Sequence, residues 1–376
     1  MKTPYSLTSA LSAHLAQAIS THGGWIGFDD FMSRTLYTPG LGYYANDSTK
    51  FGAMPAQGSD FVTAPEMTSL FGRTLAMQVA QALQVSHTTE VWEFGAGSGA
   101  LALQLLQTLE ALGQPLTRYH IVDLSGSLRS RQQLKLEKYA DTVQWVTALP
   151  DAMQGVVVGN EVLDAMPVKL LTRIKGVWYE RGVSVAPVGD DAPVDATPEF
   201  AWQDRPTELR PPVEIEGEHD YLTEIHPQGE SFMRTLADKL TVGAAFLIDY
   251  GFPEQEYYHP QRHMGTVMCH YQHRADPDPL TQVGLKDITA HVNFTGIALA
   301  AQDEGLNVLG YCTQARFLIN CGLGPLLDAS PLPVRAQAQR LIMEHEMGEL
   351  FKVIGLTKGE PWDAIGFSQG DRTHTL

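Results

Sequence analysis

Three alternating glycines follow a glutamate near residue 93, and this spacing suits a nucleotide-like ligand. Glu93 ends an apolar run, and Gly95, Gly97 and Gly99 come directly after it. Glycine adopts positive φ values and has no Cβ atom to keep a ligand away from the backbone. The apolar periodicity that begins near Ser98 predicts a helix, whose first N–H groups face the loop. We therefore predict a strand, a glycine loop and a helix N-terminus that bind a nucleotide-like cofactor.

The glycine spacing favours one class of cofactor. A dinucleotide fingerprint places its third glycine three residues after the second, and this chain has Ala100 there, which a looser form of the fingerprint admits. The run E-x-G-x-G-x-G instead resembles motif I of class I S-adenosylmethionine methyltransferases, in which the carboxylate lies near the methionine end of the cofactor. Asp123, at the end of the next apolar run, is then expected to accept both ribose hydroxyls. A glycine turn with an unrelated carboxylate is the simpler alternative.

The elements that must position this loop follow an α/β pattern. The apolar spacing predicts helices at 6–20, 66–84, 98–112, 126–139, 226–240, 288–304, 313–321 and 332–348, and strands at 119–123, 143–147, 156–159, 244–251, 306–311 and 350–357. The strand before the glycine loop completes a count of seven. We therefore predict an α/β fold with a Rossmann-like, seven-stranded class I methyltransferase sheet, an N-terminal helix and loop cap, and an inserted hairpin region.

Two regions depart from the α/β pattern. Residues 23–66 combine glycines and prolines with many aromatic side chains, which indicates an ordered loop cap, because a flexible linker is poor in aromatic residues. Residues 168–185 alternate like a hairpin, with Gly176 and Gly182 as turn candidates, and residues 186–217 are predicted to be an irregular insertion rich in Pro, Asp and Glu.

The predicted organisation has two parts. An N-terminal helical and loop cap covers residues 1–85, and a Rossmann-like cofactor-binding domain covers residues 86–376, with an insertion at about 176–225.

The composition limits the partners of the chain. The 376 residues carry a net charge of -17 and are 44% hydrophobic. Nucleic acid and anionic membranes require basic surface, so we expect neither as the main partner. No apolar stretch is long enough to span a membrane, so no membrane insertion is expected. Protein segments that carry Arg or Lys are compatible with the acidic surface, and a homodimer stays open.

The cysteines and the N-terminus indicate a compartment. Cys269, Cys312 and Cys321 are too few and too scattered for a disulfide framework or a CxxC metal site, which favours a reducing compartment. The N-terminus has only Lys2 before an amphipathic segment, without an apolar core or an Arg-rich presequence. We expect a cytoplasmic protein.

A polar cluster follows the short apolar run 156–159. It reads Asn160-Glu161-Val162-Leu163-Asp164-Ala165-Met166-Pro167. Open α/β sheets bind ligands outside the carboxyl ends of their strands, so this cluster is predicted to face the same crevice as Gly95 and Asp123.

Several longer motifs resemble, in the same order, those of the MidA family. They are Ile26-Gly27-Phe28 with Phe31-Met32, Leu36-Tyr37 with Gly42-Tyr43-Tyr44, Asp60-Phe61-Val62-Thr63-Ala64-Pro65-Glu66, Glu93 to Gly99, Asn160 to Pro167, Asp249-Tyr250-Gly251, Gly265-Thr266-Val267, Asp287 to Phe294, and Glu346 to Val353. The resemblance covers nearly the whole chain. It implies an S-adenosyl-L-methionine cofactor, held by Glu93, Gly95, Ala96, Gly97, Gly99, Asp123, Leu124 and Asn160.

The family also implies an activity. Its mitochondrial branch comprises complex I assembly factors that act as protein arginine methyltransferases, whereas substrates of its bacterial branch are mostly unassigned. This chain departs from the family where Asp123 replaces a common Glu, which keeps the carboxylate, and where Asn293 replaces a frequent Asp.

Two carboxylates suit arginine as the methyl acceptor. A guanidinium is protonated at ordinary pH, so its methylation needs carboxylates that orient it and take its proton. Glu161 and Asp164 are three residues apart, and a helical turn would place both on one face, where they could grip one guanidinium as a fork. We predict that this pair is catalytic. The alternative is an acidic pair that stabilises a helix N-terminus.

Further residues are predicted to line the substrate side of the pocket. Asp60 and Glu66 either cap the helix after Pro65 or reach into the cleft. Asp249 and Tyr250 end a strand at the carboxyl edge of the sheet. The predicted substrate or pocket residues are Asp60, Thr63, Pro65, Glu66, Pro167, Asp249 and Tyr250.

The histidines do not indicate a metal site. His259, His263, His270 and His273 lack a matching pattern of cysteine and carboxylate ligands, and Pro260 breaks any helix that would align the first two. We expect loop histidines and no metal, and we expect His291 to hydrogen-bond at a helix start.

The leading hypothesis is an S-adenosylmethionine-dependent protein arginine N-methyltransferase. A small-molecule methyltransferase is the first alternative, which a closed pocket under residues 23–66 would favour, whereas an open groove would suit a peptide. A non-catalytic cofactor-binding assembly protein is the second alternative, against which the intact glycine loop argues.

Overall fold

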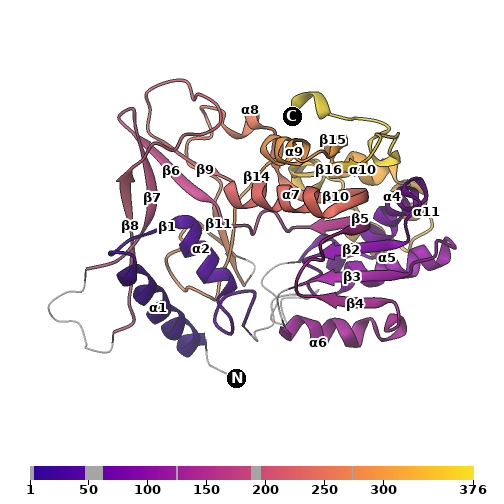
Figure 1. The fold of residues 1–376 in the computed structure, drawn as a ribbon, viewed down its shortest axis with the longest axis horizontal. Coiled ribbons are helices and arrows are strands. Elements are labelled where there is room, and N and C mark those ends of the chain that lie inside the picture. Colours follow the sequence, from indigo (N-terminus) through magenta and orange to yellow (C-terminus); the bar gives the residue numbers. More distant parts are fainter. Residues whose placement is uncertain (1–3, 47–61, 124–125, 188–195, 273) are drawn as a thin grey trace.

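The computed structural model describes residues 4–46, 62–123, 126–187, 196–272 and 274–376. Two bodies lie side by side in it, a large α/β unit and a smaller unit of strands with two helices (Figure 1). Leu124 and Asp60, two of the predicted site residues, and His273 lie outside the described residues.

A sheet of seven strands in the order β15-β16-β10-β5-β2-β3-β4 is the centre of the large unit. Strands β2 to β5 and β10 run parallel, and β16 is antiparallel to both of its neighbours. The strands are β2 (Glu90–Phe94), β3 (Arg118–Val122), β4 (Val143–Val146), β5 (Met153–Asn160), β10 (Leu240–Phe252), β15 (Asn307–Thr313) and β16 (Phe351–Lys358), and β14 (Val292–Asn293) pairs with β10 off this path. The predicted seven-stranded sheet is confirmed.

The chain winds outward from β2 to β4 and then returns to β5 on the other side of β2. The strand order therefore reverses between β2 and β5, and parallel α/β sheets bind their ligands at the carboxyl ends of the strands at such a point. The strand ends at Phe94 and Asn160 are adjacent there, because Phe94 pairs with Gly159.

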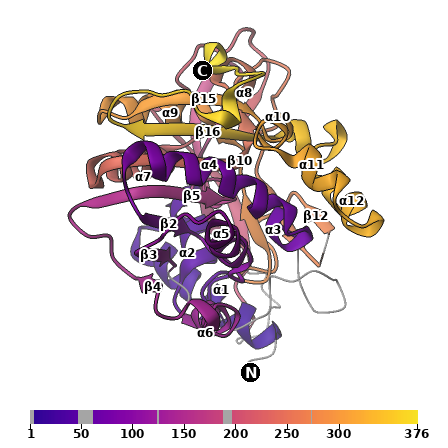
Figure 2. The same cartoon turned by 90° about the vertical axis from the view of Figure 1, so that its right-hand side faces the viewer.

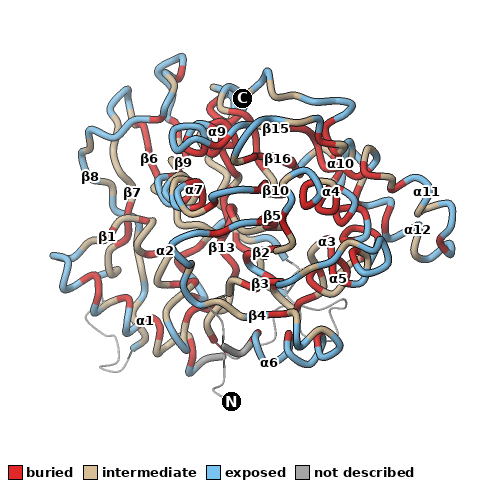
Figure 3. Tube along the Cα trace, turned by 45° about the vertical axis from the view of Figure 1, so that its right-hand side comes forward, coloured by how far each residue is buried: buried red, intermediate tan, exposed pale blue. Residues whose placement is uncertain are grey.

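Helices cover both faces of the sheet (Figure 2). Alternate residues of the central strands point to opposite faces, as the period of a strand requires. Val156 and Val158 share a core with α4 (Leu70–Ser86), α5 (Ala100–Ala111) and α10 (Gln314–Asn320) on one face. Val157 shares a core with α7 (Pro227–Lys239) and α9 (Phe294–Asp303) on the other face. Buried residues accordingly concentrate along the sheet in Figure 3. The remaining helical segments of this unit are α3 (Ala64–Met67), α6 (Gly126–Lys135), α8 (Glu254–Tyr257), α11 (Leu323–Asp328), α12 (Leu332–Gln339) and short turns at Glu137–Tyr139, Glu344–Gly348, Ile365–Phe367 and Thr373–Thr375.

The smaller unit contains two antiparallel sheets. One has β1 (Ile26–Gly27), β6 (Lys169–Ile174), β7 (Val177–Val185), β8 (Phe200–Pro206) and β9 (Tyr221–Ile225), and the other has β11 (Met268–Tyr271), β12 (Arg274–Asp276) and β13 (Asp287–Thr289). Helices α1 (Pro4–Thr21) and α2 (Phe28–Tyr37) share a core with these sheets, which includes Leu15, Phe31 and Val183. The N-terminal helices of the predicted cap thus pack on the inserted strands.

Several predicted elements differ from the structure. The hairpin at 168–185 is confirmed, with its turn at Lys175 and Gly176, which both have positive φ. Gly182 is not a turn: it pairs with Gly27, and a Cβ atom there would lie 2.2 Å from the carbonyl oxygen of Ile26. The insertion is less irregular than predicted, because β8 pairs along β7 from Tyr179 to Val185. The sequence patterns did not predict β9, which pairs with β6.

The helix predicted at 288–304 begins only at Phe294. Asp287–Thr289 and Val292–Asn293 are strands, and the Asn293 side chain caps α9 by accepting the Gly296 N–H. Asn293 is therefore the residue that hydrogen-bonds at the helix start. The prediction that His291 has this role is wrong. The helix predicted at 332–348 ends at Gln339.

Candidate active site

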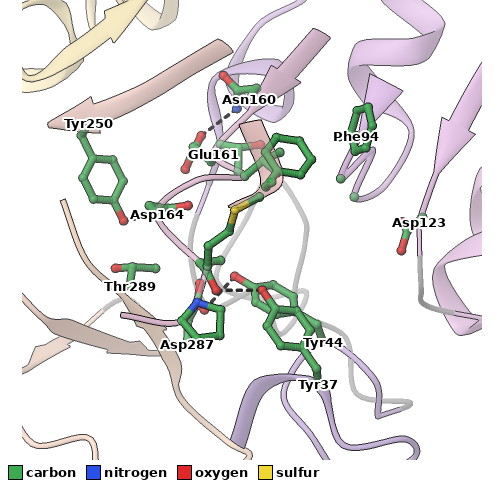
Figure 4. Close-up of a pocket in the computed structure, with 18 of the residues that line it drawn as sticks. Tyr37, Tyr44, Phe94, Asp123, Asn160, Glu161, Asp164, Tyr250, Asp287 and Thr289 are labelled. Atoms are coloured by element: carbon green, nitrogen blue, oxygen red, sulfur yellow. Dashed lines mark hydrogen bonds between the residues drawn. The ribbon is translucent and has the colours of Figure 1, made fainter. Parts of the chain in front are cut away.

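A cavity of about 1850 Å³ lies at the carboxyl ends of β2, β3, β5 and β10, where it is walled by both units. It exceeds the ~300–1,000 Å³ of an ordinary small-molecule site. Residues of the glycine loop line one end, and a group of acidic and tyrosine side chains lines the other (Figure 4). The cavity therefore has room for a nucleotide-like cofactor and a second ligand.

The glycine loop forms the first end of the cavity. Gly95 and Gly97 have φ values of 65° and 52°, which side chains disfavour, and both line the cavity. A Cβ atom on Gly95 would also lie 3.0 Å from a methyl carbon of Val162. Gly99, with φ 79°, is the N-cap of α5 and is not among the residues that line the cavity. Two of the three glycines thus expose backbone to a ligand, and the third starts the helix.

Asp123 directly follows β3 and lies beside this loop. The side-chain amide of Gln132 donates to Asp123 Oδ2 at 3.0 Å and to the carbonyl oxygen of Gly97 at 2.9 Å. One amide therefore fixes the carboxylate relative to the loop. Beyond Asp123, the cavity is lined by mostly apolar residues: Val122, Leu128, Thr147, Ala148 and Leu149.

Glu93 lies under the loop and is 1% exposed. Its carboxylate accepts a hydrogen bond from the Tyr119 hydroxyl at 2.6 Å. Burial raises the pKa of Glu93 to about 8, the Tyr119 bond opposes this rise, and the charge of Asp123 adds to it. Glu93 thus lines the predicted cofactor end of the cavity as a deeply buried acid.

Glu161 follows β5 and points into the other end of the cavity (Figure 4). Its φ of 55° is left-handed and breaks the strand. The Asn160 side-chain amide donates to Glu161 Oε1 at 2.9 Å. Burial raises the pKa of Glu161 to about 8, and the charges of Asp164 and Asp287 add to the rise. The charged groups that act on Glu161 are thus acidic side chains.

Asp164 lies on the same loop and also lines the cavity. The Tyr250 hydroxyl donates to Asp164 Oδ2 at 2.5 Å, whereas Oδ1 is buried and has no hydrogen-bond partner among the described residues. Burial raises the pKa of Asp164. Glu161 and Asp164 line the same cavity, and a loop brings them together instead of the predicted helical turn.

Asp249 explains the shape of this loop. Its Oδ2 accepts the backbone N–H groups of Val162, Leu163 and Asp164 at 3.1, 2.9 and 3.2 Å. Asp249 is 1% exposed and is not among the residues that line the cavity, so the predicted pocket role is wrong for its side chain. Burial raises its pKa well above the ordinary range, with contributions from the charges of Asp164 and Glu161. Asp249 therefore holds the loop from Glu161 to Asp164, which we call the acidic loop, on the side that faces away from the cavity.

A third acidic residue, Asp287, faces Glu161 and Asp164 from β13. The Tyr44 hydroxyl donates to Asp287 Oδ1 at 2.7 Å, and the Tyr37 hydroxyl donates to the carbonyl oxygen of Ala165 at 2.8 Å. The rings of Tyr37 and Tyr44 stack with centroids 5.6 Å apart. We call the end of the cavity formed by Glu161, Asp164, Asp287, Tyr37, Tyr44 and Tyr250 the acidic chamber.

The segment of the predicted cap around Glu66 contacts the glycine loop. The Ser98 hydroxyl donates to Glu66 Oε1, and Lys135 Nζ donates to the Ser98 oxygen at 2.8 Å. Thr63, Pro65, Glu66 and Pro167 all line the cavity, as predicted. Glu66 bonds across to the glycine loop and makes no side-chain cap on α3.

The structure brings together most of the predicted site. Glu93, Gly95, Ala96, Gly97, Asp123, Asn160, Glu161, Asp164 and Tyr250 line one cavity with the cap residues. The cavity is also lined by residues for which no pocket role was predicted, namely Tyr37, Tyr44, Asp287, Thr266 and His291. Each stands in one of the quoted motifs, so the motif match was the signal that pointed to them.

The histidine-bearing segment has no group of three metal-ligating side chains within the described ranges. Its His270 lines the cavity.

The residues fit S-adenosylmethionine. The glycine loop leaves backbone exposed where a Cβ atom would project, Asp123 supplies a carboxylate for ribose hydroxyls, and apolar residues after β3 and β4 supply a surface for a flat base. Asn160 Oδ1 is buried without a hydrogen-bond partner among the described residues, which suits a polar ligand group. When bound, this cofactor supplies an electrophilic methyl group on its sulfonium.

The strand order and the glycine loop define a class I methyltransferase, and comparisons with known proteins agree. Residues 72–312 match the family described as "Putative S-adenosyl-L-methionine-dependent methyltransferase". A crystal structure from Burkholderia thailandensis, described as a "likely methyl transferase" bound to S-adenosyl-homocysteine, is 47% identical, with a TM-score of 0.92 and coverage of 99% of this chain and 98% of that one. The chain belongs to this family of S-adenosylmethionine-dependent methyltransferases.

Curated relatives are more distant. The "Protein arginine methyltransferase NDUFAF7, mitochondrial" of Mus musculus is 28% identical, over 91% of this chain and 83% of its own length. The protein of the same name from Danio rerio is 26% identical, over 92% of this chain and 86% of its own length.

Proposed function

We propose that the enzyme is a protein arginine N-methyltransferase. The observation that carries the proposal is the acidic chamber, in which Glu161 and Asp164 lie next to the cofactor end of the cavity with one carboxylate oxygen of Asp164 left without a partner among the described residues. Buried carboxylates are costly unless a cation compensates them. A guanidinium offers a planar cation with five N–H donors. The names of the curated relatives support the same substrate.

The chamber also suits the proton balance of the reaction. Methylation of a guanidinium nitrogen would form one N–C bond at the expense of the methyl–sulfur bond of the cofactor, which would leave as the neutral thioether S-adenosylhomocysteine. One proton would be released, because the product is again a monocation. Burial raises the pKa values of Glu161 and Asp164, which supports their role in orienting the guanidinium and taking this proton. The tyrosine rings of Tyr37 and Tyr44 offer flat faces on which a guanidinium can stack.

Label transfer tests this function. Purified enzyme and S-adenosylmethionine with a deuterated methyl group are incubated with a cell extract, and tandem mass spectrometry locates the label. We expect label on arginine side chains. Label on small molecules alone would favour the alternative activity, and label on lysine or carboxylate side chains alone would contradict the proposal.

Variants of the chamber sharpen the test. Glu161→Gln and Asp164→Asn keep the side-chain shape and remove the charge, so we expect each to lower kcat by about 10²-fold or more, with unchanged affinity for S-adenosylhomocysteine. Glu110→Gln is the control, because Glu110 is exposed on α5 and pairs with Lys138. Wild-type turnover by both chamber variants would contradict the role of the pair.

We also propose a cytoplasmic location. The three cysteines are free and buried, which is compatible with a reducing compartment. No helix among the described residues is long and apolar enough to cross a membrane. Fractionation of cells that express the chain at native level checks the location, and recovery in another compartment would contradict it.

A further inference from the structure

A buried glutamate of the smaller unit holds part of the wall of the acidic chamber. Glu224 lies on β9 and is fully buried. Its Oε1 accepts the backbone N–H groups of Thr266 and Val267 at 2.7 and 3.1 Å. Its Oε2 accepts the Tyr257 hydroxyl at 2.8 Å. One side chain therefore fixes two consecutive peptide units and a tyrosine.

The segment that Glu224 holds reaches the cavity. Gly265 and Thr266 line the cavity, and neither belongs to the glycine loop or to the other residues that fit the cofactor. Gly265 has a φ of 71°, and a Cβ atom there would lie 2.7 Å from Glu224 Oε1. Glycine is therefore required at this position both for the backbone conformation and for the close approach of the carboxylate.

A chain of contacts leads from this segment to Asp164. The Thr266 hydroxyl oxygen accepts the backbone N–H of His291 at 3.0 Å. The His291 ring packs edge-on against Tyr250, with ring centroids 5.2 Å apart. The hydroxyl of Tyr250 in turn donates to Asp164. Thr266 is thus connected through His291 to the tyrosine that donates to a predicted catalytic carboxylate.

The cost of burying Glu224 argues for such a role. A carboxylate removed from water is expensive, and its three hydrogen bonds only offset that cost, so apolar packing would serve stability at least as well. What the carboxylate adds is a fixed position for Gly265–Val267 relative to β9. We infer that Glu224 is a positioning residue of methyl transfer, which aligns the acceptor side of the cavity through Thr266, His291 and Tyr250. The inference rests on the proposed acceptor role of the chamber.

Steady-state kinetics and hydrogen exchange test this inference on the full-length enzyme. Glu224→Ala removes all three bonds, so we expect a KM for the acceptor raised about ten-fold or more, with the affinity for S-adenosylhomocysteine unchanged. Glu224→Gln keeps an acceptor oxygen for Thr266 and Val267, so it should restore most of the wild-type KM. In Glu224→Ala, the amides of Thr266, Val267 and His291 should exchange faster, whereas those of Gly95–Gly99 should not.

Two further variants separate positioning from folding. Thr266→Val removes the hydroxyl that accepts the His291 N–H and contacts the Tyr257 hydroxyl at 3.1 Å. Glu224 keeps its bonds to the backbone N–H groups of residues 266 and 267, and we expect KM to rise in this variant as well. Thr223→Val is the control, because Thr223 is buried on the same strand but points to the opposite face of the sheet. The inference would be overturned by an unchanged KM in Glu224→Ala. It would also be overturned if both Glu224 variants showed a raised KM together with weaker cofactor binding and a lower melting temperature.

The proposed function and this inference fail differently. If wild-type enzyme transfers no methyl group to arginine, the proposed function fails, but hydrogen exchange still decides whether Glu224 holds the wall. If wild type methylates arginine and Glu224→Ala behaves like wild type in both assays, only the positioning role fails.

Discussion

Glu161 and Asp164 share one chamber but are held in different ways. Asn160 contacts Glu161 from the end of β5, and Tyr250 contacts Asp164 from β10. Tyr250 remains a hydrogen-bond donor, because burial and the charges of Asp164 and Asp249 raise its pKa well above its usual value. The Tyr250 hydroxyl therefore orients Asp164 as a permanent hydrogen-bond donor. Glu161 is the carboxyl group whose protonation state changes more readily.

The pKa of Glu161 predicts how arginine binding depends on pH. In the ligand-free enzyme, burial raises this pKa to about 8, so Glu161 is largely protonated at neutral pH. A bound guanidinium favours the carboxylate and lowers the pKa, so binding releases a proton. We expect the affinity for an arginine peptide to rise as the pH rises from about 6 to about 8 and then to level off.

Calorimetry in buffers of different ionisation enthalpy counts the released proton. Glu161→Gln should bind more weakly and lose most of the pH dependence in this window. A wild-type affinity that is constant across the window, or one that falls as the pH rises, would show that Glu161 does not titrate on binding.

The loop from Glu161 to Asp164 is the element that assembles the chamber. Because its residues are not helical, the three N–H groups that Asp249 accepts have no helical partners. Loss of this acceptor would leave each of them unsatisfied, at about 1–3 kcal/mol apiece.

We therefore expect Asp249→Ala to lower kcat although Asp249 does not line the cavity. The amides of Val162, Leu163 and Asp164 should lose protection against hydrogen exchange, and the melting temperature should fall. Asp204→Ala serves as the control, since Asp204 pairs with Arg181 at a partly exposed site on β8. Unchanged kcat in Asp249→Ala would show that the loop keeps its shape without this carboxylate.

The glycine loop is the second element that a variant can test. Gly97→Val places a branched side chain at φ 52°, on the wall of the cavity. Gly113→Val is a matched control, because Gly113 has a similar φ of 67° and open space around it. Both variants should bear a backbone cost of roughly 1–2 kcal/mol.

Only Gly97→Val should also lose binding of S-adenosylhomocysteine, as measured by titration calorimetry. If Gly113→Val lost it equally, the effect would come from backbone strain. If Gly97→Val bound normally, the loop would not approach the cofactor as proposed.

The elements differ in how far the sequence could predict them. The strand, glycine loop and helix around Glu93 were predictable, because φ freedom, apolar period and strand ends depend on neighbouring residues. The chamber was not, because Tyr44 and Asp287 are 243 residues apart and meet only when β13 folds against the cap. Periodicity also failed at Asn293, since the apolar residues before it belong to two short strands.

At the scale of the whole molecule, the active site lies where the two units meet. The larger unit supplies the glycine loop and the acidic loop, and the smaller unit supplies Tyr37, Tyr44 and Asp287. The net charge of -17 adds a field that attracts cations to the protein.

This charge predicts a dependence on salt. Mobile ions screen charges beyond about 10 Å at 0.1 M ionic strength, so the on-rate of a basic peptide should fall as salt is added. We expect kcat/KM for an arginine peptide with basic flanks to decrease several-fold between low and high salt, with kcat nearly constant. A peptide with neutral flanks should respond less. An increase of kcat/KM with salt would contradict an acidic approach surface.

One measurement tests the central claim most directly, namely that the acidic chamber recognises a guanidinium. Ethylguanidinium and ethylammonium are titrated into the enzyme saturated with S-adenosylhomocysteine, and NMR follows the amides of residues 161–164. These probes carry the same charge and need no knowledge of the natural sequence around the arginine. We expect saturable shifts at Glu161 and Asp164 with ethylguanidinium, weaker shifts with ethylammonium, and loss of the ethylguanidinium response in Glu161→Gln. Equal responses to both cations, or shifts that persist in Glu161→Gln, would contradict the claim.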